Sequence, residues 1–198
     1  MNAALFVPGI LSSGKTSIGK LIPYFERAGY LAELVGVPWG FYIIPLLTRR
    51  ASARKVAARA KELADAGYTV VAVGHSNGCA IIARATEIGA PLDALVFFNA
   101  ALEQSVRIGK QVRFVLNGYV PSDTVLKIAA VVPQPFWGNL GQANWKPNAA
   151  PAMWGANLTA LFRARSHNDI WKDGREAMVG PWTIHALEVH TASLLSFS

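Results

Sequence analysis

With 198 residues, of which 52% are apolar and 16% charged, the chain is long enough for one domain with a well-buried core, spanning residues 1–198. A lone cysteine excludes an internal disulfide and fits a reducing compartment. The sequence has neither a basic signal-peptide start nor an apolar run of ~18 residues. We therefore expect a cytoplasmic protein without stable membrane insertion. The formal net charge of +7 comes from scattered Lys and Arg, which argues against a nucleic-acid partner.

Strand and helix patterns alternate along the chain. Strands are expected at residues 3–7, 31–37, 69–73, 94–98, 112–116 and 158–164, and helices at 15–28, 48–66, 78–89, 124–131 and 180–195. The basic residues between 49 and 61 are expected on the solvent-facing side of their helix. Strands separated by helices pair in parallel through right-handed crossovers. The predicted fold class is therefore α/β, a three-layer sandwich around a mostly parallel sheet of about six strands.

A Gly-x-Ser-x-Gly motif, Gly74-His75-Ser76-Asn77-Gly78, lies between the third predicted strand and the helix that follows it. Its glycines permit a turn too sharp for larger side chains, and such a turn presents the serine hydroxyl beside a helix N-terminus. The motif alone is weak because Gly and Ser are common residues, and its position between strand and helix gives it weight. In this context the stretch resembles the nucleophile elbow of the α/β-hydrolase family.

The resemblance implies a catalytic triad around Ser76, since a serine hydroxyl needs a base and a group that orients the base. His167 directly follows the last predicted strand, at the sheet edge where sites gather, and matches the family's histidine. Asp123 follows the fifth predicted strand, and the order serine, acid, histidine is that of the family. Its alternative role is to cap the next helix, and Asp169 is a second candidate acid. The remaining histidines, expected to be packing or surface residues, are His75, His185 and His190.

The loop after the first strand supports two interpretations. Its residues Gly9 to Thr16 match G-x-x-x-x-G-K-T, the phosphate-binding loop of nucleotide-binding proteins. Such a protein also needs an acidic residue for Mg²⁺ at a neighbouring strand tip, and no predicted strand ends in one. Under the hydrolase resemblance the loop is the family's His-Gly-x turn, with Pro8 in the histidine's place. Ile10 and Asn77 then donate the two N–H groups of an oxyanion hole.

The resemblance covers the minimal α/β-hydrolase core only, because the leading antiparallel strands and a lid are missing. Aromatic residues in the loops are candidates for an apolar substrate pocket, or for loop anchors, namely Trp39, Tyr42 and Trp137. The sequence thus predicts a serine hydrolase that cleaves an ester-type bond of a small-molecule acyl substrate, with no metal and no cofactor. Thioesters, lactones, amides and peptides remain open as substrates, as do two other functions, phosphate-loop nucleotide binding and a non-catalytic hydrolase-fold binding module.

Overall fold

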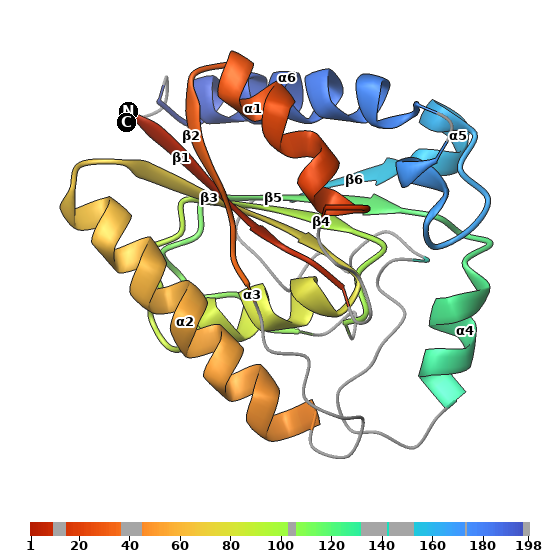
Figure 1. Cartoon of the computed structure of the whole chain (residues 1–198), viewed down its shortest axis with the longest axis horizontal. Helices are drawn as coiled ribbons and strands as arrows, with labels where there is room; N and C mark the ends of the chain where they lie inside the picture. The colour runs from red at the N-terminus through yellow and green to blue at the C-terminus, as the bar shows by residue number, and fades with distance from the viewer. Residues whose placement is uncertain are drawn as a thin grey trace.

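The structure, a computed structural model, describes residues 1–9, 15–36, 45–102, 106–131, 142, 153–172 and 174–195. Of residues 45–48, 128–131 and 191–195 it describes the backbone alone. Within these ranges the chain forms a six-stranded sheet in which every neighbouring pair is parallel, with helices on both faces (Figure 1). The predicted three-layer α/β fold is confirmed.

The sheet reverses its strand order between β1 and β3. Its strands are β1 (Asn2–Val7), β2 (Tyr30–Leu34), β3 (Thr69–His75), β4 (Ala94–Phe98), β5 (Phe114–Tyr119) and β6 (Met153–Asn157). They lie in the order β2-β1-β3-β4-β5-β6, so the chain runs from β1 to one side and then returns to β3 on the other. In open parallel sheets ligands bind at the carboxyl ends of the strands beside such a reversal. The ends of β1 and β3 are therefore where a site is expected.

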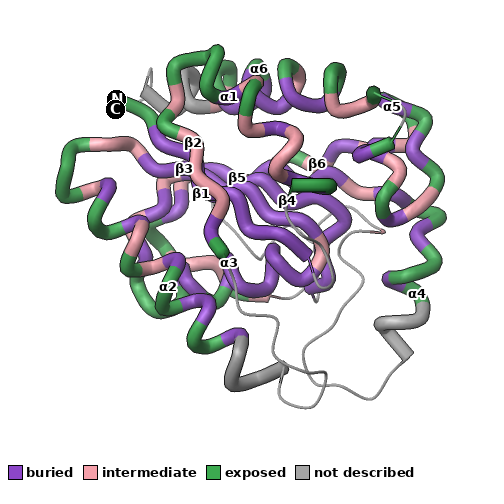
Figure 2. Tube along the Cα trace, viewed as in Figure 1, coloured by how far each residue is buried: buried purple, intermediate pink, exposed green. Residues whose placement is uncertain are grey.

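Helices cover the sheet on both faces, which leaves the four central strands buried, whereas the edge strands β2 and β6 are partly exposed (Figure 2). The helical segments are η1 (Ile18–Leu21), α1 (Ile22–Arg27), α2 (Pro45–Asp65), α3 (Asn77–Glu87), α4 (Thr124–Val131), α5 (Leu158–Phe162), η3 (Asp169–Trp171) and α6 (Glu176–Leu195). Side chains alternate between the faces of each strand: Leu5 of β1 packs in a core with α2 and α3, whereas Phe6 packs with α1 and α6. Burial on both faces explains the near-continuous apolar runs of the strands.

The long helix α6 packs against α1 and β5. It buries Val179, Ala186 and Leu187 on its inner side, together with Thr183, whose hydroxyl donates to the carbonyl of Val179 at 2.7 Å. That bond satisfies the buried hydroxyl of Thr183 within the helix itself. Neither α6 nor any other helix in the described ranges combines the length and the apolar character needed to cross a membrane.

The strand predicted at 158–164 is wrong. The last strand, β6, ends at Asn157, and the residues after it form the short helix α5. Asn157 Oδ1 accepts hydrogen bonds from the N–H groups of Thr159 at 3.0 Å and Ala160 at 3.2 Å, which caps the helix N-terminus. Arg163 closes α5 in the left-handed conformation, at φ 56°. The capping residue outweighs the strand-like apolar run that follows it.

Replacing Asn157 by Ala should lower the free energy of unfolding by about 0.5–2 kcal/mol, the usual cost of losing a side-chain cap. Denaturant unfolding followed by circular dichroism measures the change. Asn157→Asp is the matched control, because a carboxylate oxygen accepts the same two N–H groups. Equal stability of the Ala and Asp variants would contradict the capping role.

Candidate active site

The turn after β3 holds Ser76 in an unusual conformation, with φ 54° and ψ −122°. Positive φ is uncommon for residues other than glycine and is costly unless the surroundings enforce it. Here the backbone is held on both sides: the N–H of Ser76 donates to Phe98 O at 2.9 Å, and its carbonyl accepts from Cys79 N and Ala101 N, both at 3.2 Å. The turn is therefore fixed through its backbone, which leaves the half-buried hydroxyl side chain at the end of the sheet.

Close approach of neighbouring atoms explains both glycines of the motif. A Cβ on Gly78 would lie 2.1 Å from the carbonyl oxygen of Val7, and one on Gly74 would lie 2.8 Å from Cδ1 of Ile82. Contacts shorter than 3.0 Å are essentially never made by a Cβ, so any other residue would push α3 away from the strands. The glycines thus allow helix α3 to start directly against β1 and β3 (Figure 1).

The end of β1 lies against Ser76. A Cβ added to Gly9 would come within 2.9 Å of the Cβ of Ser76. Ile10 lies outside the described residues, so its predicted N–H contribution to an oxyanion hole stays a prediction. Asn77 is the first residue of α3, and the N–H groups of a first helical turn have no acceptor within their own helix.

Arg49 was expected on the solvent-facing side of its helix, and this expectation is wrong. Arg49 is only 7% exposed, and its Nε donates to Oδ1 of Asn77 at 2.9 Å. Burial lowers the pKa of Arg49 to about 10, so the guanidinium remains a cation at neutral pH. A helix-face pattern could not reveal this contact, because Arg49 lies near the start of α2, where that helix approaches the elbow. The residue after Ser76 is thus fixed by a buried cation from a second helix.

The carboxylate of Asp123 is fully buried and performs both functions considered for it from the sequence. Its Oδ2 lies 2.7 Å from Nδ1 of His167, and its Oδ1 accepts from the N–H groups of Val125 at 3.0 Å and Leu126 at 3.2 Å. The first contact orients a histidine, and the second caps α4. A carboxylate beside Nδ1 favours the tautomer that carries its proton there, which leaves Nε2 unprotonated. This pair has the form of an oriented general base.

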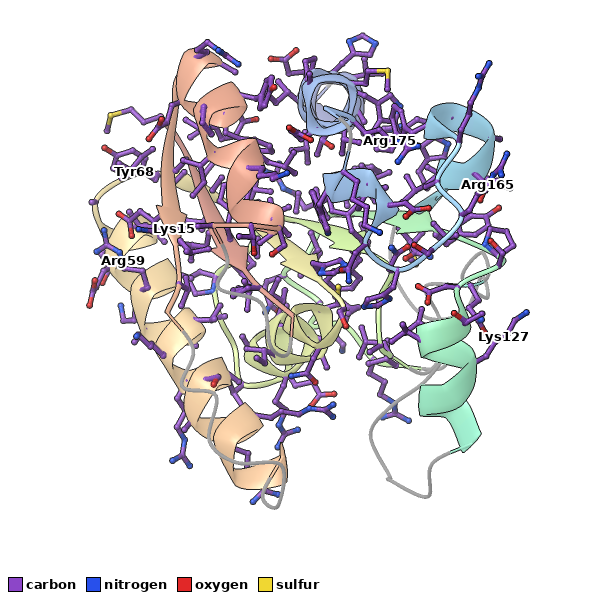
Figure 3. The ribbon with its side chains drawn as sticks, turned by 45° about the vertical axis from the view of Figure 1, so that its right-hand side comes forward. Lys15, Arg59, Tyr68, Lys127, Arg165 and Arg175 are labelled. Carbon is purple, nitrogen blue, oxygen red and sulfur yellow. The ribbon has the colours of Figure 1, made fainter. Side chains whose placement is uncertain are left out.

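The loop that carries His167 lies between α5 and η3 and is held by side chains from other elements. Ser122 Oγ donates to Arg165 O at 2.8 Å, and Lys20 Nζ donates to Trp171 O at 2.5 Å. Arg165 itself is exposed and lies, with Lys127 of α4, on the same side of the molecule in Figure 3. Because the loop has little regular backbone pairing, these side-chain contacts position it.

His75 and Asn99, at the ends of β3 and β4, hold the backbone of His167. The carbonyl of His167 accepts from His75 Nε2 at 3.1 Å and from Asn99 Nδ2 at 2.6 Å. The ring of His75 also packs against those of His167 and Trp171, with centroids 4.8 and 5.3 Å away. Burial, together with the charge of His167, lowers the pKa of His75 to about 3, so its ring stays neutral. Packing was expected for His75, but its hydrogen bond to the His167 loop and the role of Asn99 were missed.

The other candidates from the sequence lie elsewhere. Asp169 shapes the loop: its carboxylate accepts from Ser166 Oγ at 2.6 Å and from Arg165 N at 2.9 Å, and the hydrogen bond from Ser166 is the main cause that lowers its pKa. No contact of Asp169 with the ring of His167 occurs among the described hydrogen bonds. His185 is exposed, and His190 stacks on an aromatic ring of β5 at 4.6 Å.

The predicted substrate-binding residues Trp39, Tyr42 and Trp137 lie outside the described part of the chain, so the apolar pocket stays a prediction. Lys15 is exposed, and residues 15–17 form a turn before helical structure begins at Ile18. A phosphate-binding loop instead opens a helix at its Lys-Thr pair. Across the described ranges, no group of three or more His, Cys, Asp or Glu residues is arranged to hold a metal ion.

Comparison with solved structures identifies the fold. A protein of Xanthomonas campestris pv. campestris, assigned to the α/β hydrolase superfamily, superposes with a TM-score of 0.52 at 16% identity, over 83% of this chain and 94% of its own. A YdeN-like hydrolase of Pectobacterium atrosepticum gives a TM-score of 0.48 at 15% identity, over 98% and 92% of the two chains. A metagenomic carboxyl esterase gives 0.45 at 16%, over 81% and 65%. The TM-scores of these last two proteins are below 0.5, and no conclusion about this chain is drawn from them. The first likeness shows that the chain has the α/β-hydrolase fold. No protein-family model and no curated protein matches the sequence.

Because His75 is buried in its neutral form, we expect the folded protein to lose stability in acid. Its pKa falls from 6.5 to about 3 on folding, so below pH 6.5 the unfolded chain binds a proton that the folded chain does not. The free energy of unfolding should therefore fall as the pH drops from 6.5 towards 3, by at most ~1.4 kcal/mol per pH unit from this group.

Urea unfolding of wild type and His75→Phe between pH 7 and pH 4 measures this contribution. The Phe variant, although less stable at pH 7, should lose less stability per pH unit because it lacks the titrating ring. Parallel curves for the two proteins would show that His75 is not buried in the neutral form.

Proposed function

We propose that this chain, with its α/β-hydrolase fold, is a serine hydrolase that cleaves an ester-type bond of a small-molecule acyl substrate through an acyl-serine intermediate. The observation that carries the proposal is the buried hydrogen bond between Asp123 and His167, at the same sheet edge where Ser76 directly follows β3. The chain order serine, acid, histidine is also that of α/β-hydrolases. Neither a metal nor a cofactor enters the proposed reaction.

In the proposed mechanism, Nε2 of His167 takes the proton from the Ser76 hydroxyl while the oxygen attacks the carbonyl carbon of the substrate. Asp123 holds the imidazole in its productive tautomer and stabilises the imidazolium that forms. The backbone N–H groups of Ile10 and Asn77 stabilise the tetrahedral oxyanion. The imidazolium then protonates the leaving group, and the same histidine activates the water that hydrolyses the acyl-serine. Trp39, Tyr42 and Trp137 are proposed to line the acyl pocket.

Two features make the alternatives less favourable. The turn at residues 15–17 differs from the helix start that a phosphate-binding loop requires, and Lys15 has no chemistry in the hydrolase mechanism. A binding module without turnover would need Asp123 only as the cap of α4, whereas the hydrolase also uses its second oxygen, which contacts His167 Nδ1. In the proposed hydrolase, the Asp123–His167 pair acts as the base and the strained Ser76 as the nucleophile.

A fluorophosphonate probe, which reacts with activated serines, should label the wild-type protein with one equivalent, and Ser76→Ala should take up none. Mass spectrometry of the intact protein measures the stoichiometry. Lys15→Ala is the control variant: it should label at the wild-type rate, and neither protein should bind ATP or GTP saturably. Persistent labelling of Ser76→Ala would remove this serine from the mechanism. Saturable ATP or GTP binding, together with activity that Lys15→Ala abolishes and Ser76→Ala retains, would favour the phosphate-loop interpretation.

Substitution of the two candidate acids separates their roles. Asp123→Asn keeps the capping oxygen for α4, so the fold should survive, but the amide favours the wrong tautomer of His167 and kcat should fall by about 10⁴-fold, as in other triads. Asp169→Asn should lower kcat less than about tenfold, under ~1.4 kcal/mol of barrier. Single-turnover hydrolysis of a p-nitrophenyl ester measures both. Wild-type activity of Asp123→Asn would refute its assignment as the acid, and a collapse in Asp169→Asn instead would move that role to Asp169.

A further inference from the structure

We infer that His75 and Asn99 form a pair of positioning residues for the proposed base, His167. They fix its backbone at the sheet edge that also carries Ser76. The inference rests on the proposed function, because it assigns to the pair a role in that same reaction. It goes further in naming two polar residues, outside the triad and the oxyanion hole, on which the rate should depend.

Both residues lie at the carboxyl ends of adjacent strands. His75 is the last residue of β3, Asn99 directly follows β4, and their exposed fractions are 2% and 0%. The two side chains donate to one atom, the carbonyl oxygen of His167, at 3.1 and 2.6 Å. A carbonyl oxygen has two lone pairs, so this acceptor is saturated by the two strand ends. The loop is thereby attached to the ends of two buried, adjacent strands of the sheet.

The attachment controls the distance between nucleophile and base. His75 directly precedes Ser76 in the chain, so the residue that holds the backbone of His167 also belongs to the elbow. Asp123 fixes the imidazole through Nδ1, but one hydrogen bond leaves the ring free to pivot about it. Fixing the backbone of His167 as well removes that freedom. A misplacement of about 1 Å in a reacting group can cost ~100-fold in rate.

Simple core packing does not account for the choice of these side chains. Each places one polar atom on His167 and buries a second, Nδ1 of His75 and Oδ1 of Asn99, that has no hydrogen-bond partner among the described residues. Burying a polar atom without a partner is unfavourable, so an apolar residue would serve packing better. Asn99 also adopts φ 47°, a conformation that asparagine tolerates better than most residues. Each position thus holds a polar side chain that is unfavourable to bury, and the hydrogen bond that the structure gives each of them is to the carbonyl of His167.

The neutrality of His75 suits this role. In the proposed mechanism His167 becomes a cation, and the ring of His75 lies 4.8 Å from it. A permanent cation at position 75 would oppose that charge, whereas a neutral ring donates its N–H without repulsion. The groups that face His75 are the ring of His167, itself paired with Asp123, and the uncharged ring of Trp171. A histidine here therefore acts as a hydrogen-bond donor that does not titrate during turnover.

Three variants test the pair. His75→Phe keeps an aromatic ring and removes the donor, and His75→Gln restores an N–H at about the reach of Nε2. Asn99→Gly removes the other donor and suits the positive φ of the site, so it should fold. His185→Phe, on the exposed side of α6, is the matched control for loss of a histidine. Thermal unfolding first establishes that each variant is folded.

We expect His75→Phe and Asn99→Gly to lower the rate of fluorophosphonate labelling and kcat for a p-nitrophenyl ester by 10- to 100-fold, with KM changed less than threefold. His75→Gln should recover most of the rate, and His185→Phe should match wild type. The pH dependence of kcat/KM should shift in the two damaged variants, because that profile reports on the catalytic base and the base then lies in an altered position. Wild-type rates and pH profiles in folded His75→Phe and Asn99→Gly would overturn the inference.

A readout independent of hydrolysis separates this inference from the proposed function. The Nδ1 proton of His167, shared with Asp123, should give a downfield proton resonance in ¹⁵N-histidine-labelled protein, and Asp123→Asn assigns it by its loss. The resonance should persist in His75→Gln and broaden or vanish in His75→Phe and Asn99→Gly. If wild type shows no labelling, the proposed function fails, and the resonance still decides whether the pair positions His167. An unchanged resonance in both damaged variants would refute the positioning role.

Discussion

The buried hydrogen bond between Asp123 and His167 is the contact on which the arrangement of the site depends. A fully buried carboxylate is tolerated only where donors surround it. Three supply that need: Nδ1 of His167 and the N–H groups of Val125 and Leu126. Two of the three belong to the first turn of α4, so the start of that helix must lie at the end of β5. The third must come from a loop 44 residues further along the chain, which therefore has to return to the same place.

That loop is ordered by side chains rather than by regular backbone structure. The carbonyl groups of Arg165, His167 and Trp171 accept hydrogen bonds from donors on the β5–α4 turn, on the ends of β3 and β4, and on η1. Asp169 adds bonds within the loop. Carbonyl groups without regular backbone partners need other donors, and here the donors come from several separate elements. The position of His167 thus depends on the ends of three neighbouring strands, β3, β4 and β5, and on η1, and no single neighbour fixes it.

Sequence patterns predicted the parts of this arrangement that follow from local chemistry. Buried strands, the glycines around Ser76 and the position of Asp123 after its strand follow from residue type, spacing and the rule that parallel strands end together. His167 was expected directly after the last strand, but it follows helix α5, because that strand ends at Asn157. The patterns failed where a contact between distant residues decides the outcome. Leu158 begins a helix because Asn157 caps it, Arg49 is buried because α2 meets the elbow there, and the partners of His75 depend on where a distant loop lies. Residues 37–44 and 132–141, which carry the proposed substrate-binding aromatics, are outside the part of the chain that can be compared.

Two strained residues stand side by side at the centre of the sheet edge. The register that pairs His75 with Phe98 places Ser76 opposite Asn99, and both have positive φ, 54° and 47°. Each is held by a backbone hydrogen bond that extends the ladder beyond its strand, from Ser76 N to Phe98 O at 2.9 Å and from Asn99 N to Gly118 O at 3.0 Å. Strained residues persist where the surroundings over-determine them. Because two adjacent ladders, β3–β4 and β4–β5, carry the two residues, one sheet edge presents the hydroxyl of Ser76 and, through the side chain of Asn99, supports the histidine proposed to activate it.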